Sequence, residues 1–267
     1  MYYWLDFIFS TAILSLASAA DDPYVGLSLG SRTVILASLT DSGNVSITAR
    51  IPVDSAYISW FEEAVELEPK YGIPADNAAL IDFEIYWKPL QIAYGFDLPQ
   101  NLGLPKDFDW SAKVEPLVLH IEYNWNFMGF QLIHIYKAAA SLEHDAMFKG
   151  FTDVNYLGTD QKSATGIENQ LSILLAKHIR PPGPSTPPGD HFYIPDLRAV
   201  IFSGDAPPHA FDVLRTAVEK VMEGYPYAQL YDTIRPSELF AVGAAKYAQF
   251  LVEFHRDFNP HGGHEEL

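Results

Sequence analysis

Two short glycine-containing turns carry residues that could hold a ligand. Gly204 precedes Asp205 in the second turn along the chain, where the carboxylate could accept a hydrogen bond from a hydroxyl group. Gly30, Ser31 and Arg32 follow one another in the first turn and could hold an anion. Because glycine has no side chain, the backbone around it can approach a ligand closely and present its N–H groups. The Ser31 hydroxyl and the Arg32 guanidinium would add donors for phosphate oxygens. These residue types are therefore compatible with a bound phosphate.

Each turn also has a purely structural interpretation. Gly30 would then make a β-turn between two strands. Gly204 would make a tight turn between a strand and a helix that begins at Pro207 and Pro208. Folding alone would preserve both turns, so both interpretations stay open at the level of the sequence.

The first turn lies within a predicted three-stranded hairpin. Residues 25 to 39 are rich in β-branched and aliphatic side chains on both sides of the turn. Residues 41 to 44, Asp-Ser-Gly-Asn, predict a second turn that leads into a strand over 45 to 51. Apolar spacing then predicts a helix over 56 to 71.

The middle of the chain predicts two helices and a further hairpin. We expect a helix, or a strand followed by a helix, over 78 to 97 that ends in Ala-Tyr-Gly-Phe-Asp, and two strands over 117 to 121 and 130 to 136. Apolar residues at helical spacing predict a helix within 154 to 176. Residues 181 to 189 are rich in proline and glycine and predict an extended linker.

The second turn lies between a strand and a helix. Residues 199 to 202 have the composition of a buried strand, and 211 to 222 repeat apolar residues at helical spacing. A last helix is predicted over 237 to 250, where Gly243, Ala244 and Ala245 leave a face small enough for close packing.

These segments together resemble the actin-like ATPase superfamily, and most closely the nucleotide-binding domain of the seventy-kilodalton heat-shock chaperones. Residues 24 to 51 resemble its first phosphate loop, 93 to 97 the end of its first connecting helix, and 200 to 250 its adenosine loop. The resemblance implies an α/β fold of two ribonuclease-H-like lobes with lid subdomains reduced or missing. The expected divisions are a signal peptide at 1–20, lobe I at 21–112, lobe II at 113–254 with the linker at 181–189, and a disordered tail at 255–267.

The resemblance also implies a nucleotide site for ATP or ADP. The residues expected to contact the nucleotide are Gly30, Ser31, Arg32, Gly158, Thr159, Gly204 and Asp205. Glu122 is the candidate for the acidic position of the second phosphate loop. Glu84 is the candidate for the carboxylate that orients the attacking water, although a charge on an acidic helix also fits a solvated face.

Several residues depart from the family pattern. Ser28 stands where the family has the aspartate that organises the magnesium-bound water. Tyr123, Asn124 and Trp125 stand among positions where the family has glycines, and the sequence leaves open whether the side chains of Tyr123 and Trp125 fill the site. No residue replaces the lysine of the lost lid. We therefore expect weak or no ATP binding, a doubtful magnesium site, and little or no hydrolysis.

Composition limits the classes of partner. The chain has 267 residues, of which 48% are apolar, so it can bury a substantial core. Its net charge of −17 disfavours nucleic acid and anionic membrane surfaces, which basic residues bind. With no cysteine, the chain has neither disulfides nor thiolate chemistry. The histidines at 255, 261 and 264 could chelate a metal weakly, but their glycine-rich, acidic surroundings favour a disordered tail.

The N-terminus predicts entry into the secretory pathway. Residues 4 to 16 are mostly apolar and are followed by Ala-Ser-Ala-Ala at 17 to 20, which is typical of a cleaved signal. No stable membrane insertion would follow cleavage. The alternative is an uncleaved anchor or a misassigned start, since the first residues lack Lys and Arg. Asn44-Val45-Ser46, at the tip of the predicted hairpin, is the chain's one Asn-x-Ser/Thr tripeptide.

Three functions follow as hypotheses. The first is a secreted, degenerate actin-like ATPase domain. The second is a non-enzymatic interaction scaffold on the same fold, with an unidentified protein partner. The third is an active phosphotransferase, for which Glu84, Glu122 and Asp160 are the candidate carboxylates.

Overall fold

The chain folds into a mixed α/β structure, as the sequence predicted. Two units divide the chain: the first comprises residues 1–93 with 237–267, and the second comprises 94–236. The computed structural model describes residues 24–30, 32–40, 42–59, 87–110, 114–125, 128–135, 151–155, 164–179 and 194–258.

The sheet of the first unit is an antiparallel meander. Its strands are β1 (Tyr24–Leu29), β2 (Thr33–Leu39) and β3 (Val45–Pro52), in that order across the sheet. The three predicted strands are therefore confirmed. Alternate residues of β2 point to one side of the sheet and are buried there, namely Ile35, Ala37 and Leu39.

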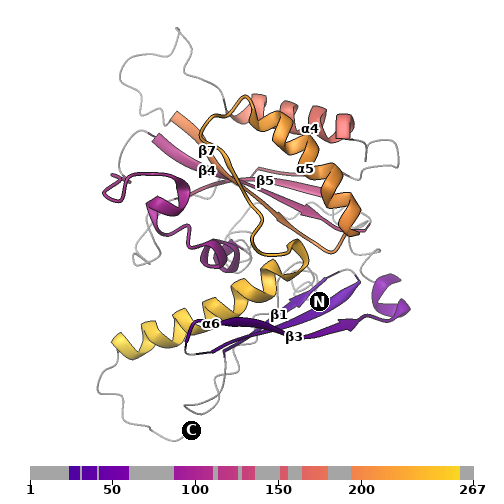
Figure 1. The fold of residues 1–267 in the computed structure, drawn as a ribbon, viewed down its shortest axis with the longest axis vertical. Helices are drawn as coiled ribbons and strands as arrows, with labels where there is room; N and C mark the ends of the chain where they lie inside the picture. The colour runs from indigo at the N-terminus through magenta and orange to yellow at the C-terminus, as the bar shows by residue number, and fades with distance from the viewer. Residues whose placement is uncertain are drawn as a thin grey trace, which may run out of the picture. The chain divides into compact units, whose positions relative to one another are not determined.

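Helix α6 (Leu239–Phe258) packs against this sheet through small residues (Figure 1). Ala241 and Ala245 lie in the same core cluster as the buried residues of β2. A Cβ placed on Gly26 of β1 would lie only 2.1 Å from the carbonyl oxygen of Ala241. The backbones of β1 and α6 thus touch, and a side chain at position 26 would force them apart.

A short helix over residues 87 to 94 also contacts α6 within the first unit. A Cβ on Gly243 would lie 2.2 Å from the carbonyl oxygen of Pro89, which explains the small-residue face predicted for this helix. The Lys246 amine donates to the carbonyl of Ala93 over 2.8 Å, at the end of the short helix. A cation is favourable at a helix C-terminus, and burial lowers the pKa of this amine.

The second unit contains a five-stranded sheet. The strands, in order across the sheet, are β6 (Phe151–Asn155), β5 (Met128–His134), β4 (Val114–Tyr123), β7 (Ile194–Ser203) and β8 (Gln229–Tyr231). β5 is antiparallel to both of its neighbours, whereas β7 is parallel to β4 and to β8. The predicted second hairpin corresponds to β4 and β5 and is confirmed.

Two helices cover one face of this sheet. They are α4 (Ala164–His178) and α5 (Pro208–Met222), which lie on the same side of the strands in Figure 1. Their apolar faces share a core with alternate residues of β4, β5 and β7. On α4 the buried residues are Ile167, Leu171, Leu174 and Leu175, as their spacing predicted.

Residues 94 to 104 form an aromatic link to β8. Tyr94 stacks on Phe96, and both rings contact the ring of Tyr231 at 5.7 and 5.1 Å between centroids. The Tyr94 hydroxyl donates to the carbonyl of Tyr231 over 3.1 Å, and burial raises the pKa of this phenol. The 3-10 helix η1 (Pro99–Leu102) follows, and its Asn101 amide donates to the carbonyl of Gly95.

The boundaries of the two units differ from those of the predicted lobes. Residues 94–112 belong to the second unit and the last helix to the first, whereas the sequence placed them in lobe I and lobe II respectively. Packing explains both differences, since the aromatic link joins β8 and α6 buries its small residues on β1 and β2. A 3-10 helix, η3 (Pro236–Glu238), leads into α6, and Arg50 of β3 forms an ion pair with Glu238.

Some predicted segments are covered only in part. The tail predicted from residue 255 is helical as far as Phe258. Residues 55 to 59 and 87 to 94 are helical, but residues 95 to 97, which were predicted to continue the second helix, form a turn at Gly95, whose φ is 66°. Residues 60 to 71 and 78 to 86 lie outside the described residues. The predicted signal at 1–20 and the linker at 181–189 also lie outside them.

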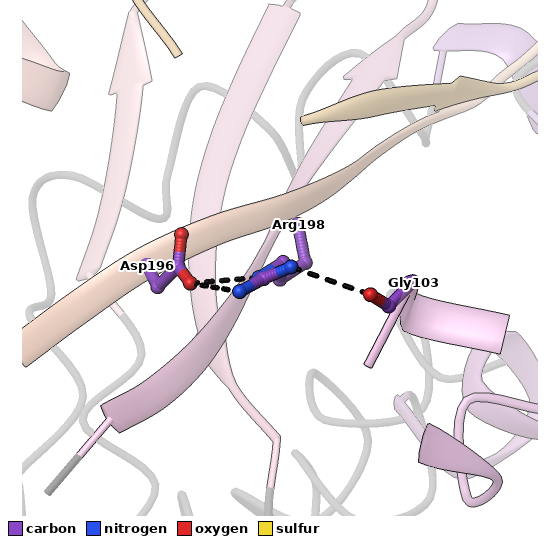
Figure 2. A network of polar contacts seen from close by, with 3 residues as sticks. All are labelled: Gly103, Asp196 and Arg198. Carbon is purple, nitrogen blue, oxygen red and sulfur yellow. Dashed lines mark hydrogen bonds and ion pairs between the residues drawn. The ribbon is translucent and has the colours of Figure 1, made fainter. Parts of the chain in front are cut away.

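Arg198 of β7 holds several parts of the second unit together. Figure 2 shows its guanidinium between the Asp196 carboxylate and the carbonyl of Gly103. The Arg198 Nε donates to Asp196 over 2.7 Å, and the guanidinium carbon lies 4.8 Å from the centroid of the Tyr227 ring. Strand β7, the loop after η1 and the loop before β8 thus meet at one side chain.

Replacing Arg198 should therefore destabilise the second unit. We expect Arg198→Met to lower the free energy of unfolding by about 2 kcal/mol, because the Asp196 carboxylate loses its charge-assisted partner while still largely covered. Arg215→Met is the matched control, since Arg215 pairs with Asp232 where both side chains are 38% exposed. Measured by urea unfolding, the free energy of unfolding should fall by less than about 0.5 kcal/mol in Arg215→Met. Equal losses for the two variants would contradict the role of Arg198.

Candidate functional site

The predicted nucleotide residues that the structure describes divide between the two units. Gly30 and Arg32 belong to the first unit, whereas Glu122, Gly204 and Asp205 belong to the second. The other predicted residues lie outside the described residues, namely Ser31, Glu84, Gly158, Thr159 and Asp160.

The turn at Gly30 is closed by its own backbone. The Gly30 N–H donates to the carbonyl of Thr33 over 3.0 Å, and the Arg32 carbonyl accepts from the N–H of Val53 over 3.1 Å. Ser28 lies in β1 opposite Ile35 and is buried. The Gly30 amide is thus engaged within the hairpin, an arrangement that agrees with the β-turn interpretation.

The three residues of the second unit meet at the C-terminal ends of β4 and β7. Glu122 of β4 lies opposite Ser203 of β7, and Gly204 and Asp205 follow directly. These strands are neighbours and parallel, but the chain leaves β4 toward β5 on one side and leaves β7 toward β8 on the other. Open α/β sheets commonly bind ligands at such a topological switch point. This edge is therefore the best candidate for a functional site in the described structure.

Asn124 connects these residues. Its amide nitrogen donates to the Glu122 carboxylate over 2.7 Å, and its amide oxygen accepts from the Asp205 N–H over 3.0 Å. Asn124 is 2% exposed, and both hydrogen bonds are partly buried. The sequence identified Asn124 only as one of the residues replacing glycines. A polar residue directly after a buried strand was the available signal for its role.

Gly204 packs directly against β4. It has a φ of 107°, and a Cβ at this position would lie 2.1 Å from the carbonyl oxygen of Tyr123. The same carbonyl accepts the N–H of Ala206 over 3.0 Å. The absence of a side chain at Gly204 therefore lets the turn fit onto β4, which is the structural interpretation of this glycine.

The turn offers few free amides to an anion. The N–H groups of Asp205 and Ala206 already donate to Asn124 and Tyr123, and Pro207 and Pro208 have no N–H. In the first turn of α5, the Ala210 N–H donates to the carbonyl of Pro207. A phosphate at a helix N-terminus depends on such amides. These residues of the second unit consequently fit the phosphates of a nucleotide poorly.

The two aromatic residues of this loop differ in their surroundings. Tyr123 is 4% exposed, and its ring lies 5.7 Å from that of Phe211 in the core beneath α5. Burial raises the pKa of its phenol. Trp125 is 47% exposed. The sequence left open whether Tyr123 fills the site, and the structure places its side chain in the core instead.

A buried polar chain runs across the opposite face of the sheet. His120 of β4 lies with Nε2 2.7 Å from the Ser203 hydroxyl and with Nδ1 2.9 Å from the amide oxygen of Gln131 on β5. Burial lowers the pKa of His120 to about 4, against a smaller opposing effect of the bond to Gln131. The ring is therefore neutral, and it donates from Nδ1 and accepts at Nε2.

The contact between Ser203 and His120 has the geometry of a nucleophile beside a base. Both side chains are 0% exposed, so no substrate can reach the hydroxyl in this arrangement. The chain of hydrogen bonds instead satisfies three polar groups within the sheet, as buried polar groups require. His120 is thus packed and hydrogen-bonded within the sheet.

The described residues include neither a cluster of metal ligands nor a helix able to span a membrane. Within the ranges that the structure describes, no three His, Asp or Glu side chains gather as metal ligands would. In that same part of the chain, no helix combines the length and the apolar character that a bilayer crossing needs.

The chain was also compared with known proteins. No protein-family model matches it, and no curated protein matches it. Its function must therefore be argued from the fold and the residues themselves.

Proposed function

We propose that this chain is a degenerate actin-like ATPase domain with two ribonuclease-H-like lobes and reduced or missing lid subdomains. It binds ATP or ADP weakly at most and hydrolyses little or none. The strand arrangement of the second unit supports the fold. A ribonuclease-H-like sheet joins a three-stranded antiparallel meander to further strands parallel to its first strand, which is the order β6-β5-β4-β7-β8 with these directions.

The closed turn after β7 carries the proposal. In the family that the sequence resembles, this turn lies against the adenosine. Here Asn124 and the backbone of Tyr123 occupy the polar groups of the turn, and Gly204 has no space on the side that faces β4. A nucleotide would have to displace these contacts before it gained its own, which lowers its affinity.

The charge of the protein also disfavours nucleotide binding. The whole chain carries a net charge of −17, and two of its carboxylates, those of Glu122 and Asp205, lie at the candidate edge. A polyphosphate would therefore meet an unfavourable potential over a long range. We also propose that residues 1–20 direct the chain into the secretory pathway.

The alternative function is a non-enzymatic interaction scaffold on the same fold. It is favoured by the observation that Gly204, Asn124 and His120 all have structural partners. These contacts support the fold whether or not a ligand binds. The scaffold would act through a protein partner, since the net charge disfavours nucleic acid.

Nucleotide titration tests the proposal. ATP and ADP, with and without magnesium, would be titrated into protein that begins at Asp21, with tryptophan fluorescence and heat as readouts. We expect no saturation below about 1 mM, which corresponds to roughly −4 kcal/mol of binding free energy. We also expect phosphate release at the rate of buffer alone. Saturable binding in the micromolar range, or measurable turnover, would contradict the degenerate site.

Asp205→Asn is the site variant for these titrations, because it changes the charge and keeps the backbone. Asp212→Asn, at an exposed position of α5, is its matched control. If weak binding occurs at the proposed edge, only the variant at 205 should alter it. A folded protein that shows no binding at several millimolar nucleotide would leave the scaffold function.

A further inference from the structure

The turn between β2 and β3 displays a modification sequence. Asn44, Val45 and Ser46 form the Asn-x-Ser tripeptide, which is the acceptor pattern for N-linked glycans. In the structure Asn44 ends the turn that begins at Thr40, and both Asn44 and Ser46 are exposed.

The space around this turn is open. Thr40, Ser42 and Gly43 are exposed together with Asn44. A Cβ placed on Gly43 would meet no atom within 4 Å, in contrast to Gly26 and Gly204. A bulky group attached here would therefore extend into solvent rather than into the sheet.

Two backbone hydrogen bonds close the turn, and the side chain of Asn44 adds a third. The Thr40 N–H donates to the Asn44 carbonyl over 3.1 Å, and the Gly43 N–H donates to the Thr40 carbonyl over 2.8 Å. The Asn44 amide nitrogen donates to the Ser42 hydroxyl over 3.0 Å. This amide carries two hydrogens, so replacing one of them leaves the other for Ser42.

We propose that Asn44 is an N-glycosylation site. The donor is an oligosaccharide linked through pyrophosphate to a membrane lipid. A bond forms between the Asn44 amide nitrogen and the anomeric carbon, the bond from that carbon to the pyrophosphate breaks, and the amide loses one proton. No oxidation or reduction is involved. The inference depends on the secretory entry proposed above and is independent of nucleotide binding.

The test uses the full chain, expressed in eukaryotic secretory cells. Purified protein would be treated with a peptide N-glycosidase and measured by intact mass and by peptide mass spectrometry. We expect a loss of mass equal to one N-linked glycan, with Asn44 converted to aspartate by the enzyme. Asn44→Gln and Ser46→Ala should abolish the glycan. Ser46→Thr and Ser42→Ala keep the acceptor pattern and should retain it.

A second version of the protein tests glycosylation of Asn44 independently of residues 1–20. In this version, residues 1–20 are replaced by a signal peptide known to direct secretion. If only this version is glycosylated at Asn44, the site is supported and the targeting role of residues 1–20 is wrong. If this version is secreted without a glycan at Asn44, the proposed site is wrong. A glycan on the native chain supports both.

Discussion

Gly204→Ala should lower the free energy of unfolding by about 4 kcal/mol, because two penalties add at this position. The φ of 107° is costly for any residue with a side chain. The new Cβ would also lie 2.1, 2.6 and 2.8 Å from the O, C and N atoms of Tyr123, and backbone atoms in a paired strand cannot easily move away.

Gly43→Ala is the matched control for this variant. Gly43 also has a positive φ, of 80°, but a Cβ there would meet nothing within 4 Å. Only backbone strain remains, so we expect Gly43→Ala to lower the free energy of unfolding by about 1 kcal/mol. Urea unfolding followed by tryptophan fluorescence and circular dichroism would measure both variants. Similar losses for the two would mean that the turn does not pack on Tyr123 as described.

The destabilisation expected at position 204 also limits which variants can test nucleotide binding. A bulky residue at position 204 is a natural choice to block a ligand, but here it would disrupt the contact with Tyr123 before any ligand is added. Loss of binding in such a variant would report loss of folding. Asp205→Asn avoids this difficulty, because the backbone N–H that donates to Asn124 is retained.

Acidification should destabilise the protein through His120. The folded structure lowers the pKa of His120 to about 4 from its ordinary value of 6.5, because burial disfavours the charged ring. Between these two pH values the unfolded chain binds a proton that the folded chain does not. The contribution of His120 to the free energy of unfolding is therefore fully present above about pH 6.5. It falls by about 3 kcal/mol as the pH approaches 4.

His120→Asn isolates this effect, because asparagine does not titrate. At neutral pH the variant should be less stable by about 1 to 3 kcal/mol, since Ser203 and Gln131 lose a buried partner. As the pH falls, wild type should lose stability faster than the variant, so the gap between them should narrow. Urea unfolding at a series of pH values would measure the gap. A constant gap would show that His120 is not kept neutral in the folded state.

The sequence by itself determined most of the local structure. A high content of β-branched and aliphatic residues around turn sequences predicted the strands that became β1 to β3, and helical spacing predicted α4 and α5 with their buried faces. The small residues at 243 to 245 predicted a close helix contact. These features depend on neighbours within a few turns or pairs along the chain, and so the pattern of residue types contains them.

Only the tertiary structure decided what the candidate site residues do. Asp205 meets Asn124 across 81 positions of sequence, and His120 meets Ser203 across 83. Such contacts follow from the register of β4 against β7, which residue types do not specify on their own. For the glycine of the second turn, the sequence left both a ligand contact and a tight turn open. The backbone of Tyr123 beside it favours the turn, because two segments far apart in the chain pack there without space for a side chain.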